Sequence, residues 1–251
     1  MKVFVYLILF VLFWLPLAAE DHSEVIDSAN ECYIRGEYER AIELYQSIID
    51  NGYEASELYY NLGNAYYKSN KITYAILNYE RAKILDPYDE DIEHNLRVAE
   101  KLVIDKIDMI PEFFVNTWIK KITNTFSTDM WAMISIIAFV AFLLLLSIFL
   151  YSRIIVLKKI SFWISILIFI FSIAAFSFSY KQKEKVTNRD TAIIFTPAVT
   201  VKSSPDESGT DLFVIHEGTK VTITEALGEW VEIKLSDGNV GWVAASDLVL
   251  I

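Results

Sequence analysis

Side chains that could act as nucleophiles, general bases or metal ligands are few in this sequence, and they are scattered. The three histidines, His22, His94 and His216, lie in separate segments without the spacing of a metal site. Cys32 is the only cysteine, so it can form neither an intramolecular disulfide nor a metal-binding cluster. We expect it to be a small buried side chain on a helix. The glycine-rich phosphate loop, G-x-S-x-G and H-E-x-x-H motifs are all missing. The sequence therefore predicts no catalytic, cofactor or metal site.

The chemistry that the sequence does offer is recognition by aromatic, amide and acidic side chains. Tyrosines and asparagines occur at helical spacing between residues 20 and 110, and tryptophans alternate with aliphatic residues near the carboxyl end. Acidic residues are concentrated in the first of these segments, which accounts for the formal net charge of −11. An acidic surface argues against nucleic acid as a partner, because binding there requires basic groups that displace counterions.

The elements that must position these residues follow one another in a definite order, which begins with an apolar leader. Met1-Lys2 precedes an apolar run that reaches Leu17, and Ala18-Ala19 comes before acidic sequence. These features are typical of a secretory signal peptide, which we expect to cover residues 1–19. An uncleaved membrane anchor is the alternative. Both interpretations carry the chain from Glu20 onward across the cytoplasmic membrane.

A helical repeat follows the leader. Ala41-Ile42 recurs as Ala75-Ile76, and Tyr45 recurs as Tyr79, at an offset of about 34 residues. This period is that of the tetratricopeptide repeat (TPR), a helix–turn–helix unit. We therefore expect an all-α TPR domain over residues 20–110. Its last helix, predicted from Asp89 to Ile104, would cap the stack with a polar outer face.

The second repeat unit resembles the TPR family pattern in its large and small residues. These residues are Tyr59, Leu62, Gly63, Tyr66, Ala75, Tyr79 and Pro87. In that family, the stacked repeats bind extended peptides or partner helices in a concave groove. The resemblance implies a protein-binding groove on the first helix of each unit, lined by Asn30, Tyr33, Tyr60, Asn61, Asn64 and Tyr67. The alternative is that the tyrosines pack inside the stack and the acidic residues form a solvated face.

Two long apolar runs, residues 130–151 and 160–180, come next, and neither contains a charged residue. A helix of about 20 apolar residues is long enough to cross the hydrocarbon core of a bilayer. The connection over residues 152–159 carries Arg153, Lys158 and Lys159, which favours a cytoplasmic loop. The sequence therefore predicts a two-helix transmembrane hairpin with both ends facing the periplasm.

The segment before the first apolar run, residues 111–129, combines aromatic and basic residues. The residues concerned are Phe113, Phe114, Trp118, Phe126 and the pair Lys120-Lys121. This composition is typical of an amphipathic helix that lies at the level of the lipid headgroups. An extension of the helical stack is the alternative.

Short alternating strands begin at Thr191, after a linker over residues 181–190. The segments Gly228–Ile233, Asp237–Val243 and Ser246–Val249 resemble a bacterial SH3 domain. This resemblance implies an all-β SH3-like barrel over residues 191–251. Exported bacterial SH3 domains often contact cell-wall peptides, and the candidate ligand-binding residues are Phe213, His216, Trp230 and Trp242. The alternative for Phe213 and Trp242 is a place in the core.

The whole order of parts predicts a multidomain membrane protein with an all-α TPR helical repeat, a transmembrane hairpin and a bacterial SH3-like barrel. It resembles the TPR- and SH3-domain membrane proteins of bacterial aerotolerance (Bat) operons. That resemblance implies a non-enzymatic scaffold in the bacterial inner (cytoplasmic) membrane. Its partners would be the lipid bilayer, proteins with von Willebrand factor A domains and a MoxR-type ATPase. The alternatives are a sensor that binds peptidoglycan and an accessory subunit of a membrane enzyme or transporter.

Overall fold

The computed structural model describes residues 23–107, 114–187 and 190–251. The expected signal peptide and Phe113 lie outside these residues. The chain divides into two compact units, one that ends at Tyr53 and one that begins at Glu54.

The first unit contains one helix pair, α2 (Ser23–Ile34) and α3 (Tyr38–Asp50). One face of each helix is apolar and buried, as the helical spacing predicts. The buried side chains are Ala29, Cys32, Ala41, Ile42, Tyr45 and Ile48. Cys32 is a buried free thiol, in agreement with the expected small interior side chain.

Three further helices open the second unit: α4 (Ser56–Lys68), α5 (Ile72–Leu85) and α6 (Glu90–Glu100). The Asp89 carboxylate caps α6 by accepting hydrogen bonds from the backbone N–H groups of its first turn. The helix ends earlier than the predicted Ile104. Its last carbonyls and those just beyond it accept hydrogen bonds from Lys106 Nζ, at 3.2 Å from Glu100 O and 2.8 Å from Val103 O. This lysine satisfies carbonyl groups that a continuing helix would have bonded.

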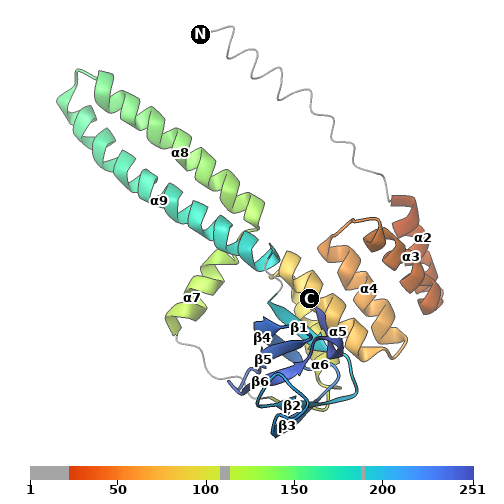
Figure 1. Ribbon diagram of the computed structural model, residues 1–251. Coiled ribbons are helices and arrows are strands. Elements are labelled where there is room, and N and C mark those ends of the chain that lie inside the picture. The colour runs from red at the N-terminus through yellow and green to blue at the C-terminus, as the bar shows by residue number, and fades with distance from the viewer. Residues whose placement is uncertain (1–22, 108–113, 188–189) are drawn as a thin grey trace. The chain divides into compact units, whose positions relative to one another are not determined.

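The apolar runs form two long antiparallel helices, α8 (Thr128–Tyr151) and α9 (Ile155–Thr187), which lie side by side in Figure 1. Both are long and apolar enough to cross a membrane. Only 11% of the most apolar stretch of α8 and 22% of that of α9 is buried, whereas a core helix of a soluble protein would be mostly buried. The second helix begins at Ile155, so the predicted loop over residues 152–159 is shorter and Lys158 and Lys159 are helical.

Serine hydroxyls join the two long helices. Ser135 Oγ donates to Ser172 O and Ser172 Oγ donates to Ser135 O, both at 3.0 Å. Ser179 Oγ donates to the carbonyl of Thr128, also at 3.0 Å. Small hydroxyl side chains allow apolar helices to approach closely and satisfy their own polar atoms in hydrocarbon. These contacts make α8 and α9 a packed hairpin.

The expected juxtamembrane segment forms α7 (Phe114–Thr123). Trp118, Ile119 and Ile122 are exposed on this helix, an apolar surface of the kind that binds at the headgroup level. Trp131 Nε1 of α8 donates to the carbonyl of Thr123 at 2.7 Å, so the end of α7 is tied to the start of the hairpin. Tyr88 Oη donates to Lys121 O at 2.6 Å, which also links α7 to the turn between α5 and α6.

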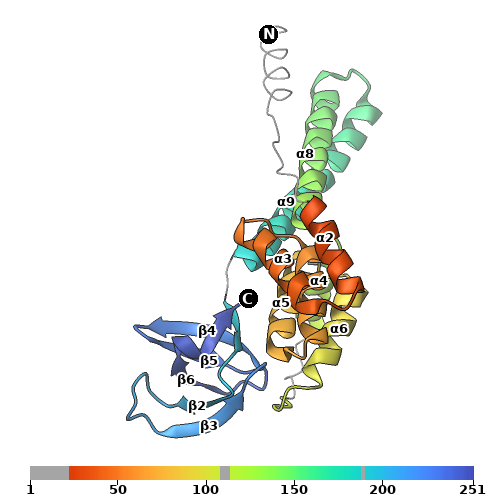
Figure 2. The ribbon, with the colours of Figure 1, turned by 90° about the vertical axis from the view of Figure 1, so that its right-hand side faces the viewer.

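The carboxyl-terminal segment is a seven-stranded antiparallel sheet with the strand order β3-β2-β6-β5-β4-β1-β7, drawn in blue in Figure 2. The first strand begins at Thr191, as the sequence predicts. The strands are β1 (Thr191–Ile194), β2 (Ala198–Lys202), β3 (Asp211–His216), β4 (Lys220–Leu227), β5 (Trp230–Lys234), β6 (Val240–Ala244) and β7 (Leu248–Leu250).

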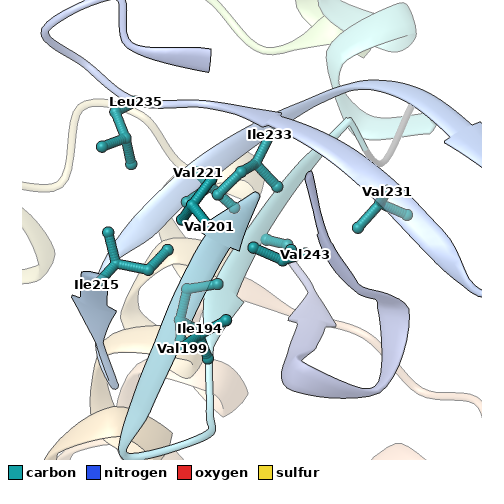
Figure 3. Packing of buried hydrophobic residues seen from close by; sticks show 10 residues of the cluster. Ile194, Val199, Val201, Ile215, Val221, Val231, Ile233, Leu235 and Val243 are labelled. Carbon is teal, nitrogen blue, oxygen red and sulfur yellow. The ribbon is translucent and has the colours of Figure 1, made fainter. Parts of the chain in front are cut away.

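Alternate residues of these strands form one aliphatic core, which Figure 3 shows from close by. Because successive side chains point to opposite faces, Val231 and Ile233 are buried while Trp230, Glu232 and Lys234 lie on the outer face. Ile107, from the chain after α6, packs against this core although it lies far from the barrel in sequence.

Candidate interaction sites

The second helix pair is held at close range by a glycine and a tyrosine ring. A Cβ atom at position 63 would lie 2.7 Å from Cδ1 of Tyr79, so only a glycine fits without displacing the ring. Tyr79 itself is 1% exposed. This contact explains why the pattern places a small residue on α4 opposite a large residue on α5.

A network of amide and hydroxyl groups lies beside this contact. Tyr79 Oη donates to Asn64 Oδ1 at 2.8 Å, and Asn95 Nδ2 of α6 donates to the same oxygen at 2.9 Å. Asn95 Nδ2 also lies 3.1 Å from Tyr60 Oη. The network therefore brings together two predicted groove residues, Asn64 and Tyr60, and holds them with a third residue from the capping helix.

The same hydrogen bond occurs in the first helix pair. Tyr45 Oη donates to Asn30 Oδ1 at 2.5 Å, and both residues precede their counterparts Tyr79 and Asn64 by one repeat period. The side-chain oxygens of Asn30 and Asn64 thus each bond a buried tyrosine of their own pair. Any peptide contact by Asn30 or Asn64 would use the other atoms of the amide group.

The six predicted groove residues are all half-buried. They lie on the first helix of each pair, and they are Asn30 and Tyr33 on α2 and Tyr60, Asn61, Asn64 and Tyr67 on α4. Tyr59, Tyr66 and Tyr79 are buried instead, so tyrosines of this segment divide between packing and surface positions. The role of the six residues in binding stays a prediction. Asn95 was missing from the predicted set, because it lies on the capping helix and not in a repeat unit.

The four candidate residues of the barrel divide into two groups. Trp230 and Trp242 are half-exposed on the outer face of β5 and β6. Trp242 is paired with Glu232 and Lys202 of the neighbouring strands, and Trp230 is paired with Leu227, which is 56% exposed. This outer face therefore combines aromatic, aliphatic and charged side chains.

Phe213 and His216 lie elsewhere. Phe213 is paired with Val201 and packs against the barrel core, as the alternative interpretation for this residue expects. His216 Nδ1 lies 2.9 Å from Asp105 Oδ1, and the backbone N–H of His216 donates to Asp105 Oδ2 at 2.6 Å. The imidazole thus contacts the chain that follows α6.

The Asp105 carboxylate receives a third hydrogen bond, from Thr219 Oγ1 at 2.7 Å. Burial by itself would raise the pKa of Asp105, but the hydrogen bonds from His216 and Thr219 outweigh it and hold that pKa below its ordinary value. The carboxylate is therefore ionised at neutral pH. Sequence reasoning did not find Asp105, because nothing in the local pattern marks an acid whose partners lie far along the chain.

Within the described residues, histidine, cysteine and carboxylate side chains form no group of three that could hold a metal ion.

Known families match two parts of the chain. The bacterial SH3 domain matches residues 197–249, and the tetratricopeptide repeat matches residues 56–89. No curated protein matches the sequence. Both families are typically modules for interaction and not for catalysis. The chain therefore contains a TPR unit formed by α4 and α5 and a bacterial SH3 domain, separated by two helices that could span a membrane.

Proposed function

We propose that this protein is a non-enzymatic adaptor of the bacterial cell envelope, anchored in the inner membrane with its TPR and SH3 modules in the periplasm. The observation that carries the proposal is the attachment of two interaction modules to the two ends of one apolar hairpin. Such a protein brings partners together at the membrane surface.

The tight connection between α8 and α9 supports a common side for both modules. A spanning hairpin with so short a turn returns the chain to the side from which it entered the bilayer. Arg153 lies in this turn, and Lys158 and Lys159 lie in the first turns of α9. These basic residues favour the cytoplasm for the turn and the periplasm for the modules. The apolar leader agrees with an exported amino terminus.

Protease added to spheroplasts tests this orientation. We expect both the TPR and the SH3 module to be digested while the short turn stays protected. Protection of either module, with digestion after lysis, would rule out the periplasmic orientation.

The half-buried polar face of α4 is the surface that we propose for protein partners. Tyr60, Asn61, Asn64 and Tyr67 offer hydrogen-bonding groups and ring edges to an extended peptide or a helix. The order of the modules further suggests a scaffold of the aerotolerance type. In that case the partners are membrane proteins with von Willebrand factor A domains and a MoxR-type ATPase.

Site-specific photo-crosslinking in intact cells tests the groove. Asn64 is a poor site for a probe because its side-chain oxygen accepts hydrogen bonds from Tyr79 and Asn95. A photoreactive residue at position 61 or 67 should instead trap a distinct set of proteins, whereas one at the exposed position 40 on α3 should not. Equal capture from all three positions would contradict the groove assignment.

Cell-wall binding is a second candidate function, favoured by the outer face of the barrel. Trp230 and Trp242 lie half-exposed on adjacent strands, and aromatic faces of this kind stack on sugars and on peptide groups. The full protein in detergent micelles should then sediment with peptidoglycan, and Trp230→Ala should weaken sedimentation at least tenfold. Lys234→Ala, on the same strand and face, serves as the control. Sedimentation that is absent, or unchanged in Trp230→Ala, would exclude this function.

A further inference from the structure

The turn between β3 and β4 of the SH3 domain lies against the second TPR unit. Lys220 Nζ of β4 is 2.6 Å from Glu80 Oε2 of α5. The Glu80 side chain is 5% exposed, whereas that of Lys220 is 42% exposed. The repeat therefore contains a buried carboxylate whose cationic partner comes from the barrel, about 140 residues later in the chain.

A second carboxylate repeats this arrangement. The Asp105 side chain is 15% exposed. It accepts two hydrogen bonds from His216 and one from Thr219, and both donors belong to the barrel. Two further polar contacts lie nearby. Thr73 Oγ1 of α5 donates to Glu217 Oε2 at 3.1 Å, and Arg81 donates to the carbonyl of Leu250 at 2.9 Å.

Apolar groups fill the space between these polar contacts. A Cβ atom on Gly218 would lie 2.9 Å from Val103 Cγ2, and the φ angle of Gly218 is +85°, so a glycine is required there on both counts. The rings of Tyr74 and Phe195 meet edge to face with centroids 5.0 Å apart. Ile107 packs against the barrel core. The contact therefore combines shape, charge and apolar burial.

A buried carboxylate without a partner is strongly unfavourable, because desolvation is not offset by attraction or hydrogen bonding. Glu80 on α5 and Asp105 in the chain after α6 are the two acids of this contact. The barrel supplies their partners, Lys220, His216 and Thr219. We propose that the SH3 domain docks on the second TPR unit as its partner, through the β3–β4 turn and the ends of β1 and β7. The two modules then act as one folded body, and His216 is a docking residue instead of a ligand contact.

This docking surface is separate from both candidate ligand surfaces. It uses α5 and the chain after α6, whereas the predicted groove residues lie on α2 and α4. It uses the β3–β4 turn, whereas Trp230 and Trp242 lie on β5 and β6. A docked protein can therefore hold a ligand at the groove and another at the barrel at fixed separation.

Charge reversal in the full protein, purified in detergent micelles, tests the docking. Glu80→Lys and Lys220→Glu each place like charges at a contact of 2.6 Å. Each single variant should raise hydrogen exchange of the α5 and β3–β4 amides by about tenfold, because contacting residues couple strongly. The double variant restores the opposite charges and should return exchange to within about twofold of the original protein.

Lys234→Glu is the matched control, since it reverses a lysine on the exposed face of the same barrel. Single reversals that change exchange no more than this control would overturn the proposal. A double variant whose effects simply add would overturn it as well. If a single variant loses protection throughout one module, the double variant still tests the docking. Protection of that module should recover in the double variant only if residues 80 and 220 are in contact.

Asp105→Asn provides an independent measurement of the same contact. It keeps the shape of the side chain and removes the charge that His216 and Thr219 face. We expect faster exchange at the His216 and Thr219 amides and unchanged protection of β5 and β6. Unchanged exchange at the turn would contradict the docking role of His216.

Discussion

The helix pairs α2–α3 and α4–α5 share one hydrogen bond but differ in what surrounds it. Tyr45 bonds Asn30 in the first pair, and Tyr79 bonds Asn64 in the second. At the closest approach of the helices, however, the first pair has Ala29 where the second has Gly63. The TPR family match covers the second pair and not the first.

The two pairs together show which contacts the repeat pattern encodes. The pattern residues fix the geometry within a pair, and this geometry survives the change from glycine to alanine. The second pair carries additional contacts: Asn95 of α6 bonds Asn64, and Lys220 of the barrel bonds Glu80. Side chains of the second pair therefore contact α6 and the barrel as well as each other, which agrees with the closer fit of this pair to the family pattern.

The largest expected difference between the pairs concerns this glycine position. In Gly63→Ala the new methyl group would lie 2.7 Å from the buried Tyr79 ring. Overpacking of this kind costs roughly 1–3 kcal/mol, of which the better helix propensity of alanine offsets about 1 kcal/mol. We expect a net loss of stability in α4–α5, measured by hydrogen exchange of its amides.

The reciprocal change is the control for the glycine prediction. Ala29→Gly should destabilise α2–α3 by about 1 kcal/mol through helix propensity. The loss of a buried methyl group adds to this cost, and no overpacking is involved. If Gly63→Ala instead stabilises its pair, the close approach of Gly63 and Tyr79 is not maintained in solution.

A smaller difference is expected when the shared hydrogen bond is removed. Tyr45→Phe and Tyr79→Phe each delete one hydroxyl group, at a typical net cost of about 1 kcal/mol. Asn64 Oδ1 keeps its bond from Asn95 Nδ2 in Tyr79→Phe, so its oxygen stays satisfied. We therefore expect Tyr45→Phe to cost more than Tyr79→Phe, as measured by exchange of α3 and α5. Equal losses would show that Asn95 does not support the second pair.

The sequence was sufficient for the elements of both modules, because each depends on local periodicity. Alternating residues predicted that strands begin at Thr191, and helical spacing with the offset of Tyr45 and Tyr79 predicted the repeat. Element ends were less predictable. The helix α6 stops at Glu100, where Lys106 binds its carbonyl groups. The helix α9 begins at Ile155, before the second apolar run, and the length of an apolar run does not mark where its helix starts.

The contacts between segments could not be predicted in the same way. Asp105 and His216 are separated by 111 positions, and neither belongs to a motif. The sequence predicts a ligand contact at His216 but does not reveal its acidic partner. Asn95 likewise acquires its role from the packing of α6. Polar pairs of this kind depend on tertiary structure, whereas the buried aliphatic residues follow from periodicity.

Acid titration should distinguish the two helix pairs through Asp105, which follows α6 and binds His216 and Thr219 of the barrel that docks on the second pair. Its pKa is lowered in the folded protein, so the stabilising contribution is complete above the ordinary value of 3.8 and is lost as pH falls through the lowered folded value. We expect protection of the β3–β4 turn to decrease in that acidic window. Asp105→Asn should abolish this dependence, and α2–α3 should behave identically in both proteins. An unchanged pH profile in the variant would contradict the assignment.

The smallest expected effect concerns exposed ion pairs, which should not distinguish one helical segment from another. Arg40 pairs with Glu43 on α3, and Arg97 pairs with Glu93 on α6, with all four side chains about half exposed or more. Exposed pairs at this spacing contribute about 0.3–0.5 kcal/mol and are screened by salt. Arg40→Ala and Arg97→Ala should therefore lower stability equally and only slightly, and the loss should vanish at high salt. A larger loss of stability in Arg97→Ala that persists at high salt would mean that α6 depends on surface charge as well as on the packing of Ile92 and Leu96. Such a result would contradict the view that packing and Asn95 alone hold α6 to the second pair.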